Sequence, residues 1–277
     1  MNSQTAPEHR ACQPGGLPMR LTDMAPSSIE FLYGLNPCFE ALRAHRRKFH
    51  NAFINDATRE SPRLKKLVDV LERNDIPVSY VDRGRLTQLC GSDEHQGAVI
   101  RSSTYPYASW ESLFGPDRLL LLDNVEDPHN VGAILRSAEI FGFNGVFLPV
   151  KGVPDVYPSV VKVSAGAAEF MQIAREKDSN RYAREAKERG YKILALDAAG
   201  KTMLDSLGGM PGEKILLVVG GEDRGVGQFI LNMADAIVSI EQCGHVNSLN
   251  ASVAAGIAMH SLRARTAPAP TAVTEHE

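Results

Sequence analysis

Three short segments of this 277-residue chain carry polar side chains and glycines in patterns that could do chemistry. The first is DNVEDPHNVGAILR at residues 123–136, a polar turn that leads from an apolar run into a helical pattern. Part of it has a purely structural explanation, because Asp127-Pro128 typically starts a turn and Asn130 is a good helix N-cap. Gly132 lies in the first helical turn, where glycine weakens a helix, and therefore indicates a close approach of another segment.

Arg136 lies nearly two helical turns beyond Asn130. Spacing alone leaves two readings open: an arginine that faces solvent, or one that binds a ligand.

The second segment is VGGEDRGV at residues 219–226. Its three glycines follow an apolar run and could form an ordinary tight turn. They could also expose backbone amides to a nucleoside-like ligand, with Glu222 near a helix start. The segment lacks the G-x-G-x-x-G and G-K-[ST] patterns, which disfavours a dinucleotide fold or a P-loop.

The third segment is SIEQCGHVNSLNAS at residues 239–252. Ser248 could cap the helix that follows, while Asn250 and Ser252 add further polar groups at its start. Residues 251–258 are apolar almost all round, which predicts a buried helix. Polar groups at a buried helix start need partners, and a bound ligand would supply them.

An alternating pattern of apolar runs and amphipathic segments positions these residues. The runs at 119–122, 146–148, 192–196, 215–219 and 237–240 predict strands, and the segments at 131–141, 181–189, 228–233 and 248–263 predict helices. Continuous apolar strands separated by helices indicate a parallel sheet that is covered on both faces. Ligands of such sheets bind beyond the carboxyl ends of the strands, where all three segments lie.

A smaller α/β unit is predicted at residues 29–104. It contains helical patterns at 36–48 and 62–74, an apolar run at 49–55, and strand patterns at 78–81 and 98–101. Residues 105–117, without any period, indicate a linker or a docking segment. Residues 1–28 and 266–277 are polar and rich in Pro, Ala and Thr, so we expect disordered tails there.

Positive charge is concentrated in the first part of the chain, where basic residues outnumber acidic ones over residues 1–105. The run Arg43-Ala-His-Arg-Arg-Lys48 and the group Arg63, Lys65 and Lys66 stand out. A solvated helix face explains such runs in many proteins. The sharper hypothesis is contact with phosphates, which would be strongly salt-dependent.

The composition, with 43% hydrophobic and 23% charged residues, is that of an ordinary globular protein. A net charge of −3 argues against a protein that coats polyanions. The four cysteines show no C-x-x-C spacing, so we expect no zinc site and reduced thiols inside a cell. We expect neither a membrane span nor a secretion signal, and predict a cytoplasmic location, with the mitochondrial matrix as the alternative.

Taken in order, the three segments resemble the three motifs of the SpoU branch of the SPOUT methyltransferases. The matching residues are DPHNVGAILR, GGEDRG, and the pattern S-I-x-x-x-G-x-V-x-S-L-N-x-S-V-A-A-G-I, over residues 118–263. The first unit, from FLYGLNP at 31–37 to HQG at 95–97, resembles the N-terminal RNA-binding domain of that family. The combination is similar to the guanosine 2'-O-methyltransferases of large-subunit ribosomal RNA in bacteria and mitochondria.

The resemblance implies a parallel-sheet SPOUT domain at residues 118–265 with a C-terminal trefoil knot, and a homodimer whose active sites lie near the subunit interface. It implies S-adenosylmethionine as the methyl donor, and no metal. The cofactor contacts it implies, largely through backbone, are Gly220, Ile240 and Leu249. The catalytic surround it implies is Asn130, Arg136, Glu222, Ser248 and Asn250. The residues expected to hold RNA are Arg43, Arg46, Arg47 and Lys48.

One departure concerns Glu241, Gln242 and Cys243, which stand where the family usually has Pro and then small or apolar residues. Proline fixes φ and removes a donor, and glutamate does neither. The carboxylate of Glu241 could attract a cationic sulfonium, or it could face solvent.

The implied reaction is methylation of a ribose 2'-hydroxyl in structured RNA, and this hydroxyl excludes DNA as the substrate. The resemblance implies that Arg136 is the proton acceptor, which is chemically awkward because arginine stays protonated in proteins. Either a desolvated pocket neutralises it, or it stays charged, clamps the target phosphate and polarises the hydroxyl; we favour the clamp. The alternatives are a transfer-RNA 2'-O-methyltransferase, a non-catalytic RNA-binding or ribosome-assembly factor, and a plain nucleotide-binding enzyme.

Overall fold

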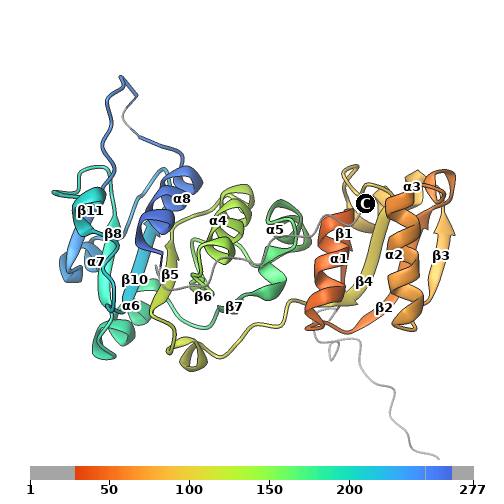
Figure 1. The fold of residues 1–277 in the computed structure, drawn as a ribbon, viewed down its shortest axis with the longest axis horizontal. Coiled ribbons are helices and arrows are strands. Elements are labelled where there is room, and N and C mark those ends of the chain that lie inside the picture. Colours follow the sequence, from red (N-terminus) through yellow and green to blue (C-terminus); the bar gives the residue numbers. More distant parts are fainter. Residues whose placement is uncertain (1–28, 247, 264–277) are drawn as a thin grey trace, which may run out of the picture.

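The computed structural model describes residues 29–246 and 248–263, which form two α/β units side by side (Figure 1). The tails predicted at residues 1–28 and 266–277 lie outside the described residues. Among the described residues, no helix is both long and apolar enough to cross a membrane.

The first unit is built on a four-stranded sheet in the order β1-β4-β2-β3, in which only β2 and β3 run parallel. Its elements are β1 (Ile29–Tyr33), α1 (Leu35–Ala44), β2 (Phe49–Asn55), α2 (Pro62–Arg73), β3 (Val78–Val81), α3 (Arg83–Cys90) and β4 (Ala98–Ser103). Helices α1 and α2 pack on one face around Leu42 and Leu67. On the other face α3 packs through Leu86. The helices thus cover both faces of a small sheet.

The second unit is a seven-stranded parallel sheet in the order β7-β6-β5-β10-β8-β11-β9. Its strands are β5 (Arg118–Asp123), β6 (Gly145–Phe147), β7 (Gln172–Ala174), β8 (Lys192–Leu196), β9 (Thr202–Met203), β10 (Ile215–Gly220) and β11 (Ala236–Ser239). Its helices are α4 (Pro128–Ile140), α5 (Pro158–Val163), α6 (Ser179–Glu188), α7 (Gln228–Met233) and α8 (Ala251–Leu262). The α/β class and the parallel sheet are therefore confirmed, and the trefoil knot stays a prediction.

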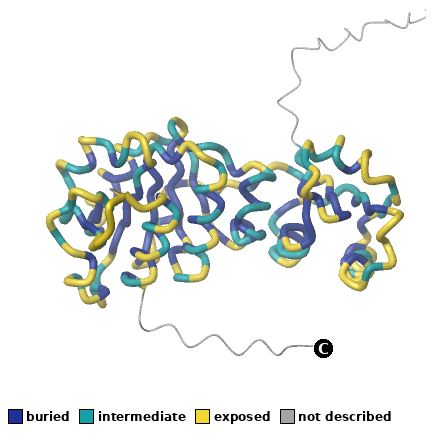
Figure 2. Tube along the Cα trace, turned by 90° about the horizontal axis from the view of Figure 1, so that it is seen from above, coloured by how far each residue is buried: buried dark blue, intermediate teal, exposed yellow. Residues whose placement is uncertain are grey.

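Each face of the second sheet has its own core. Leu135 of α4, Val160 of α5 and Met259 of α8 share one apolar cluster, and Tyr182 of α6 and Ile230 of α7 belong to the other. Helices therefore cover both faces, as continuous apolar strands require. Figure 2 shows the buried segments gathered inside each unit, with exposed residues around them.

A buried arginine at the start of β5 fixes the end of α8. Arg118 Nε donates to the Leu262 carbonyl at 2.5 Å, and the other guanidinium nitrogens donate to carbonyls of Gly209, Met210 and Glu213. Burial lowers the pKa of Arg118 below its usual value. Carbonyls at a helix end have no partner within the helix, so this arrangement satisfies groups that would otherwise be costly to bury. It sets the position of α8, whose first turn belongs to the site described below.

Two helix starts differ from the sequence prediction. Helix α4 begins at Pro128 with Asp127 as its N-cap, whose carboxylate accepts from His129 N at 2.8 Å, so Asn130 lies inside the helix. Proline suits the first helical turn because it lacks an amide hydrogen there. Helix α8 begins after Asn250, which caps it in place of Ser248. Both asparagines have side chains engaged elsewhere in the site.

Some elements were missed because their local patterns are weak. Strand β1 precedes the first predicted helix, and α3 and α5 are too short for a clear helical period. Gly132 behaves as predicted: a Cβ there would lie 2.6 Å from Cβ of Val163, so α4 and α5 approach closely at this glycine.

The two units meet in a buried interface. Leu32 and Ala41 of the first unit share an apolar cluster with Val161 and Ala168 of the second. Arg47 lies between the units, with its Nη2 atom 2.8 Å from Glu169 Oε1 and its Nη1 atom 2.6 Å from Glu30 Oε2. Both the Arg47 and the Glu169 side chains have no exposed surface. The units are thus joined by apolar packing and by a buried ion pair.

Candidate active site

The glycines after β10 are required by close packing against the turn after β5. A Cβ on Gly221 would lie 1.8 Å from the carbonyl oxygen of Asn124, and one on Gly220 would lie 2.3 Å from the carbonyl carbon of Gly225. Gly225 has a φ of +58°, in the region that favours glycine. Because β10 pairs with β5 and Gly220 is opposite Asp123, these two turns meet at the carboxyl edge of the sheet.

Asp123 holds this edge together. Its side chain is buried, and it accepts hydrogen bonds from Ser179 Oγ at 2.6 Å and from the Gly227 amide at 2.8 Å. A buried carboxylate needs such donors, since an unpaired charge is costly to desolvate. Asp123 therefore connects the ends of β5 and β10 with the start of α6.

Three side chains from three distant segments meet above this edge. Asn250 Nδ2 donates to Glu222 Oε1 at 2.6 Å, and Asn130 Nδ2 donates to the same oxygen at 3.2 Å. Asn250 Nδ2 also lies 3.0 Å from Asn130 Oδ1. The carboxylate of Glu222 is therefore the centre of a network that joins the turn after β10 to the starts of α4 and α8.

Asn250 has a second role as the cap of α8. Its Oδ1 accepts from the amides of Ser252 and Val253 and from Ser252 Oγ at 2.6 Å. Asn250 and Ser252 thus have partners within the chain, and Ser248 and Asn250 are exposed, so the prediction of a buried helix start was wrong. Val253 is 50% exposed and Ile257 is 41% exposed, so the helix itself is not buried on all sides in the single chain.

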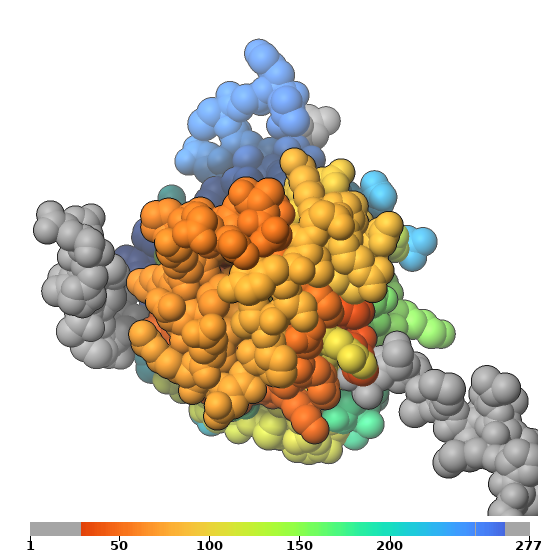
Figure 3. Space-filling model, turned by 90° about the vertical axis from the view of Figure 1, so that its right-hand side faces the viewer, coloured from red at the N-terminus to blue at the C-terminus, as the bar shows by residue number. Residues whose placement is uncertain are grey.

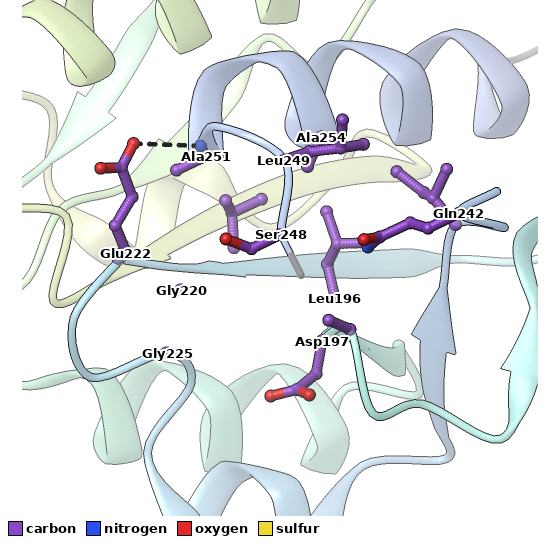
Figure 4. A pocket seen from close by; sticks show the side chains of 14 residues that line it. Leu196, Asp197, Gly220, Glu222, Gly225, Gln242, Ser248, Leu249, Ala251 and Ala254 are labelled. Atoms are coloured by element: carbon purple, nitrogen blue, oxygen red, sulfur yellow. Dashed lines mark hydrogen bonds between the residues drawn. The ribbon is translucent and has the colours of Figure 1, made fainter. Parts of the chain in front are cut away.

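A cavity of about 200 Å³ opens beside this network, at the carboxyl ends of β8, β10 and β11 (Figure 4). Figure 4 shows Glu222 at one end, near Ala251, and Gln242 at the other, near Leu196. The residues that line the cavity are Leu196, Asp197, Ala198, Val219, Gly220, Gly221, Glu222, Gly225, Ile240, Gln242, Ser248, Leu249, Ala251 and Ala254. Gly220, Ile240 and Leu249, expected from the sequence to contact the cofactor, all line it.

Two acidic residues, Asp197 and Glu222, line this cavity, and the sequence predicted only Glu222. Asp197 directly follows β8, and its Oδ1 accepts from the Ala199 amide at 2.8 Å. The rule that ligands bind beyond carboxyl ends of parallel strands could have found it. Glu241 is exposed and does not line the cavity, whereas Gln242 does. In this structure Glu241 therefore faces solvent, and the acidic residues that line the cavity are Asp197 and Glu222.

A second cavity, of about 210 Å³, lies on the other side of Glu222. It is lined by Asn124, Val125, Glu126, Asp127, Asn130, Gly221, Glu222, Asp223 and Arg224. Glu222 and Gly221 border both cavities, so the polar network forms the wall between them. Among the described residues, no group of His, Cys, Asp or Glu is arranged to hold a metal ion.

Arg136 stands apart from the other residues of the predicted catalytic surround. It is exposed on α4, lines neither cavity, and has no hydrogen-bond partner for its side chain among the described residues. Asn130, Glu222 and Asn250 are brought together, and Ser248 lines the first cavity. The single chain thus joins three of these five residues in one hydrogen-bond network, places Ser248 in the adjoining cavity, and leaves the arginine on the neighbouring helix surface.

The structure divides the basic run that was expected to bind RNA. Arg47 is buried in its ion pair with Glu169, and Arg46 donates to the carbonyls of Glu169, Met171 and Pro106. The guanidinium groups of Arg46 and Arg47 therefore face the second unit. The prediction that these two residues bind RNA was wrong. The physical reason is that a helix end turns successive residues in different directions. Arg43 and Lys48 remain exposed.

Comparison with known proteins agrees with this geometry. The family model described as the SpoU rRNA Methylase family matches residues 117–260, and the model described as RNA 2'-O ribose methyltransferase substrate binding matches residues 31–108. The chain belongs to the SpoU family of RNA 2'-O ribose methyltransferases. The resemblance seen in its three motifs is therefore confirmed.

Curated relatives show the same family, and solved structures show the same fold. An uncharacterized tRNA/rRNA methyltransferase of Mycolicibacterium paratuberculosis is 34% identical over 91% of this chain and 83% of its own length. A TrmH family tRNA/rRNA methyltransferase of Bacillus subtilis is 30% identical over 86% of this chain and 97% of its own. The AdoMet-bound rRNA methyltransferase of Sinorhizobium meliloti superposes with a TM-score of 0.71 at 21% identity, over 85% of this chain and 87% of that one. The AdoMet complex of AviRb from Streptomyces viridochromogenes gives 0.70 at 21% identity, over 85% and 90%.

Proposed function

We propose that this SpoU-family enzyme transfers a methyl group from S-adenosylmethionine to the ribose 2'-oxygen of a guanosine in large-subunit ribosomal RNA. The observation that carries the proposal is the junction at Glu222, where the first cavity meets a network of Asn130, Glu222 and Asn250. The added N-terminal unit favours ribosomal RNA, because a second domain suits a larger folded target.

The first cavity fits the chemistry of S-adenosylmethionine. Its apolar side, which includes Val219, Ile240 and Leu249, suits an adenine ring, and its glycines leave backbone exposed to the ligand. Its two carboxylates, Asp197 and Glu222, suit a cationic ligand. When bound, S-adenosylmethionine supplies an electrophilic methyl group on a sulfonium.

The residues of the chain then have to hold the RNA hydroxyl in line and help it lose its proton. The amides of Asn130 and Asn250 share one acceptor, Glu222 Oε1, so the three side chains hold one another in position. Ser248 lines the cavity from the loop that leads into Asn250, where its hydroxyl is available to a ligand. The second cavity, on the other side of Glu222, is the place we propose for the target nucleotide.

We further propose that the enzyme works as a homodimer through α4 and α8. Val253 and Ile257 lie one turn apart on α8, and Ile140 of α4 is 64% exposed. Such apolar residues gathered on two packed helices are typical of an interface. Arg136 lies one turn before Ile140 on α4, so pairing of this face places Arg136 at the boundary between two copies.

The decisive experiment is transfer of tritiated methyl groups to large-subunit ribosomal RNA and to bulk transfer RNA, followed by mapping of the alkali-resistant ribose. We expect labelling of ribosomal RNA at one guanosine. Labelling of transfer RNA alone would identify the alternative substrate. No transfer to either RNA, together with no binding of S-adenosylmethionine, would support a non-catalytic RNA-binding or assembly factor.

The clamp hypothesis for Arg136 has its own test. Under it, Arg136→Lys retains measurable methyl transfer and loses RNA affinity, because lysine keeps the charge but not the bidentate geometry. The two quantities are the rate of methyl transfer and the dissociation constant for RNA. Unchanged RNA binding with abolished turnover would contradict the clamp and favour a direct role in proton transfer.

A further inference from the structure

A basic groove lies between α1 and α2 on the first unit, away from the site described above. The groove encloses about 500 Å³ and draws its basic residues from both groups that stand out in the sequence. Its lining residues are Asn36, Phe39, Glu40, Leu42, Arg43, His45, Arg63, Lys66, Val70 and Asn74. Two stretches that are separate in the sequence thus form one surface.

Positive charge exceeds negative charge in this groove. Arg43, Arg63 and Lys66 face a single carboxylate, Glu40, which lies 3.6 Å from Arg43 and leaves the arginine side chain 77% exposed. Arg63 donates to the neutral Asn36 Oδ1 at 2.6 Å, so its charge is not compensated there. Exposed cations around a concave surface attract an anionic ligand.

Neighbouring lysines on α2 point to different sides of the helix. Lys66 lines the groove, whereas Lys65 is paired with Glu60 at 2.7 Å and lines a different hollow, which Tyr80 of β3 also borders. In Figure 3, which looks onto the first unit, the orange segment that contains α2 forms part of its outer surface. The groove therefore has a matched position just outside it, with the same residue type and one step away in sequence.

The groove is held in a defined place relative to the active site. Helices α8, α4, α5, α1 and α2 follow one another across the molecule, each in contact with the next (Figure 1). The first two carry Asn250 and Asn130 at their starts, and the last two form the groove. Arg43 also lies over the ring of Phe170 in the second unit, at 5.7 Å from its centroid. An extended polyanion could therefore contact the groove and the active site together.

We propose that this groove binds the sugar-phosphate backbone of the RNA substrate at a distance from the methylated nucleotide. The inference rests on the proposed function, since it takes the substrate to be RNA. Arg43, Arg63 and Lys66 bind the phosphates, and the partly exposed ring of Phe39 offers an apolar contact to an unpaired base. This replaces the linear run of four basic residues with a surface drawn from two helices.

The test compares Arg63→Glu and Lys66→Glu with the control Lys65→Glu. Each full-length variant is titrated into a fluorescent single-stranded RNA of mixed sequence at several salt concentrations. All three reverse one charge, so a general effect of net charge is the same in each. We expect the two groove variants to bind RNA at least several-fold more weakly than the control. We also expect their plots of log affinity against log salt to lose roughly 0.7 of slope for each lost phosphate contact.

Two further measurements keep the outcomes distinct. Thermal unfolding checks that each variant is folded, and binding of S-adenosylmethionine checks that the second unit is intact. If the control and the groove variants lose equal affinity, or if neither loses any, the groove proposal is overturned even when wild-type enzyme methylates RNA. If wild-type enzyme neither methylates RNA nor binds the oligonucleotide, the proposed function fails with it.

Discussion

At the scale of single residues, Glu222 is the group on which the candidate site depends. One of its oxygens accepts from both Asn130 and Asn250 and lies 3.5 Å from the Ala251 amide. The side chain is exposed, so its role is in positioning neighbours and facing ligands rather than in supporting the core. A substitution of Glu222 is therefore expected to lower activity without unfolding the protein.

The first prediction compares Glu222→Ala with Glu222→Gln. Alanine removes the shared acceptor, so Asn130 and Asn250 lose their alignment and methyl transfer should fall by at least about tenfold, the equivalent of about 1.4 kcal/mol. Glutamine keeps one acceptor oxygen and should retain more activity, while S-adenosylmethionine binds more weakly because a carboxylate is lost. The measurements are initial rates and cofactor titration. If both variants transfer methyl groups at the wild-type rate, Glu222 has no positioning role.

The second prediction concerns His95, which the sequence singled out only within the HQG resemblance. Its side chain is buried, and Nδ1 accepts from the Gly97 amide at 3.0 Å, which requires an unprotonated Nδ1. Burial, together with the charge of Arg83, lowers the pKa of His95 below its ordinary 6.5. The imidazole of His95 therefore binds a proton more readily in the unfolded chain than in the folded one. The free energy of unfolding is fully retained above about pH 6.5 and falls below it, by up to about 1.4 kcal/mol per pH unit.

Urea unfolding at about pH 7.5 and about pH 5.5 tests this, with His95→Asn as the comparison. The amide oxygen of asparagine can replace the Nδ1 acceptor and does not titrate. We expect the wild-type protein to lose more stability between the two pH values than the variant does. Identical losses would show that His95 does not cause the pH dependence.

At the scale of elements, the ion pair between Arg47 and Glu169 connects the end of α1 to the second unit. Removing one partner of a buried pair leaves an uncompensated charge, which costs about 3–5 kcal/mol. Glu30 also contacts Arg47 but keeps 18% of its side-chain surface exposed, and burial raises its pKa above the usual value. Glu169 and Glu30 thus allow the loss of a fully buried partner of Arg47 to be compared with the loss of a partly exposed one.

The third prediction is that Glu169→Gln lowers the free energy of unfolding far more than Glu30→Gln does. Glutamine has nearly the same shape as glutamate, so the difference reports charge and not a cavity. Denaturant unfolding measures both variants. Contact between the units can be followed in parallel by limited proteolysis at residues 103–108, which we expect to become more susceptible in Glu169→Gln. Equal, small losses would mean that apolar packing alone joins the units.

At the scale of the whole molecule, the exposed face of α4 and α8 matters most. In the single chain, Arg136 lies apart from the network of Asn130, Glu222 and Asn250. A second copy that covers this face would place Arg136 at the boundary between two subunits. The apolar residues at the face have no role in the core of a single chain, since Val253 and Ile257 are about half exposed. The dimer and the catalytic proposals therefore support each other.

The fourth prediction is that Ile257→Asp gives a monomer that folds and has lost methyl transfer. A buried carboxylate at an interface is costly, whereas the same side chain on an exposed helix surface is tolerated. Phe229→Asp is the control, because Phe229 is 42% exposed on α7, on the opposite face of the sheet. Sedimentation velocity and methyl transfer are the measurements. Dimers that persist in Ile257→Asp would place the interface elsewhere.

The sequence by itself determined the parallel sheet and the position of its three motifs. Apolar runs and helical periods are local patterns, and parallel strands must end at one edge, so polar segments after strands were expected to meet there. The order of the motifs then indicated the family. Local patterns also explain the misses: β1, α3 and α5 are too short or weakly patterned, and helix caps shift by a few residues with small changes in hydrogen bonding.

Only the tertiary structure decided which side chains meet. Asn130 and Asn250 are 120 residues apart, yet they share Glu222 because strand order brings β10 beside β5 and α8 beside α4. The same holds for the basic run, where Arg46 and Arg47 turn towards the second unit while Arg43 joins Arg63 and Lys66 across two helices. The physical reason is that a side chain's direction depends on the packing of its element, which spacing along the chain does not contain.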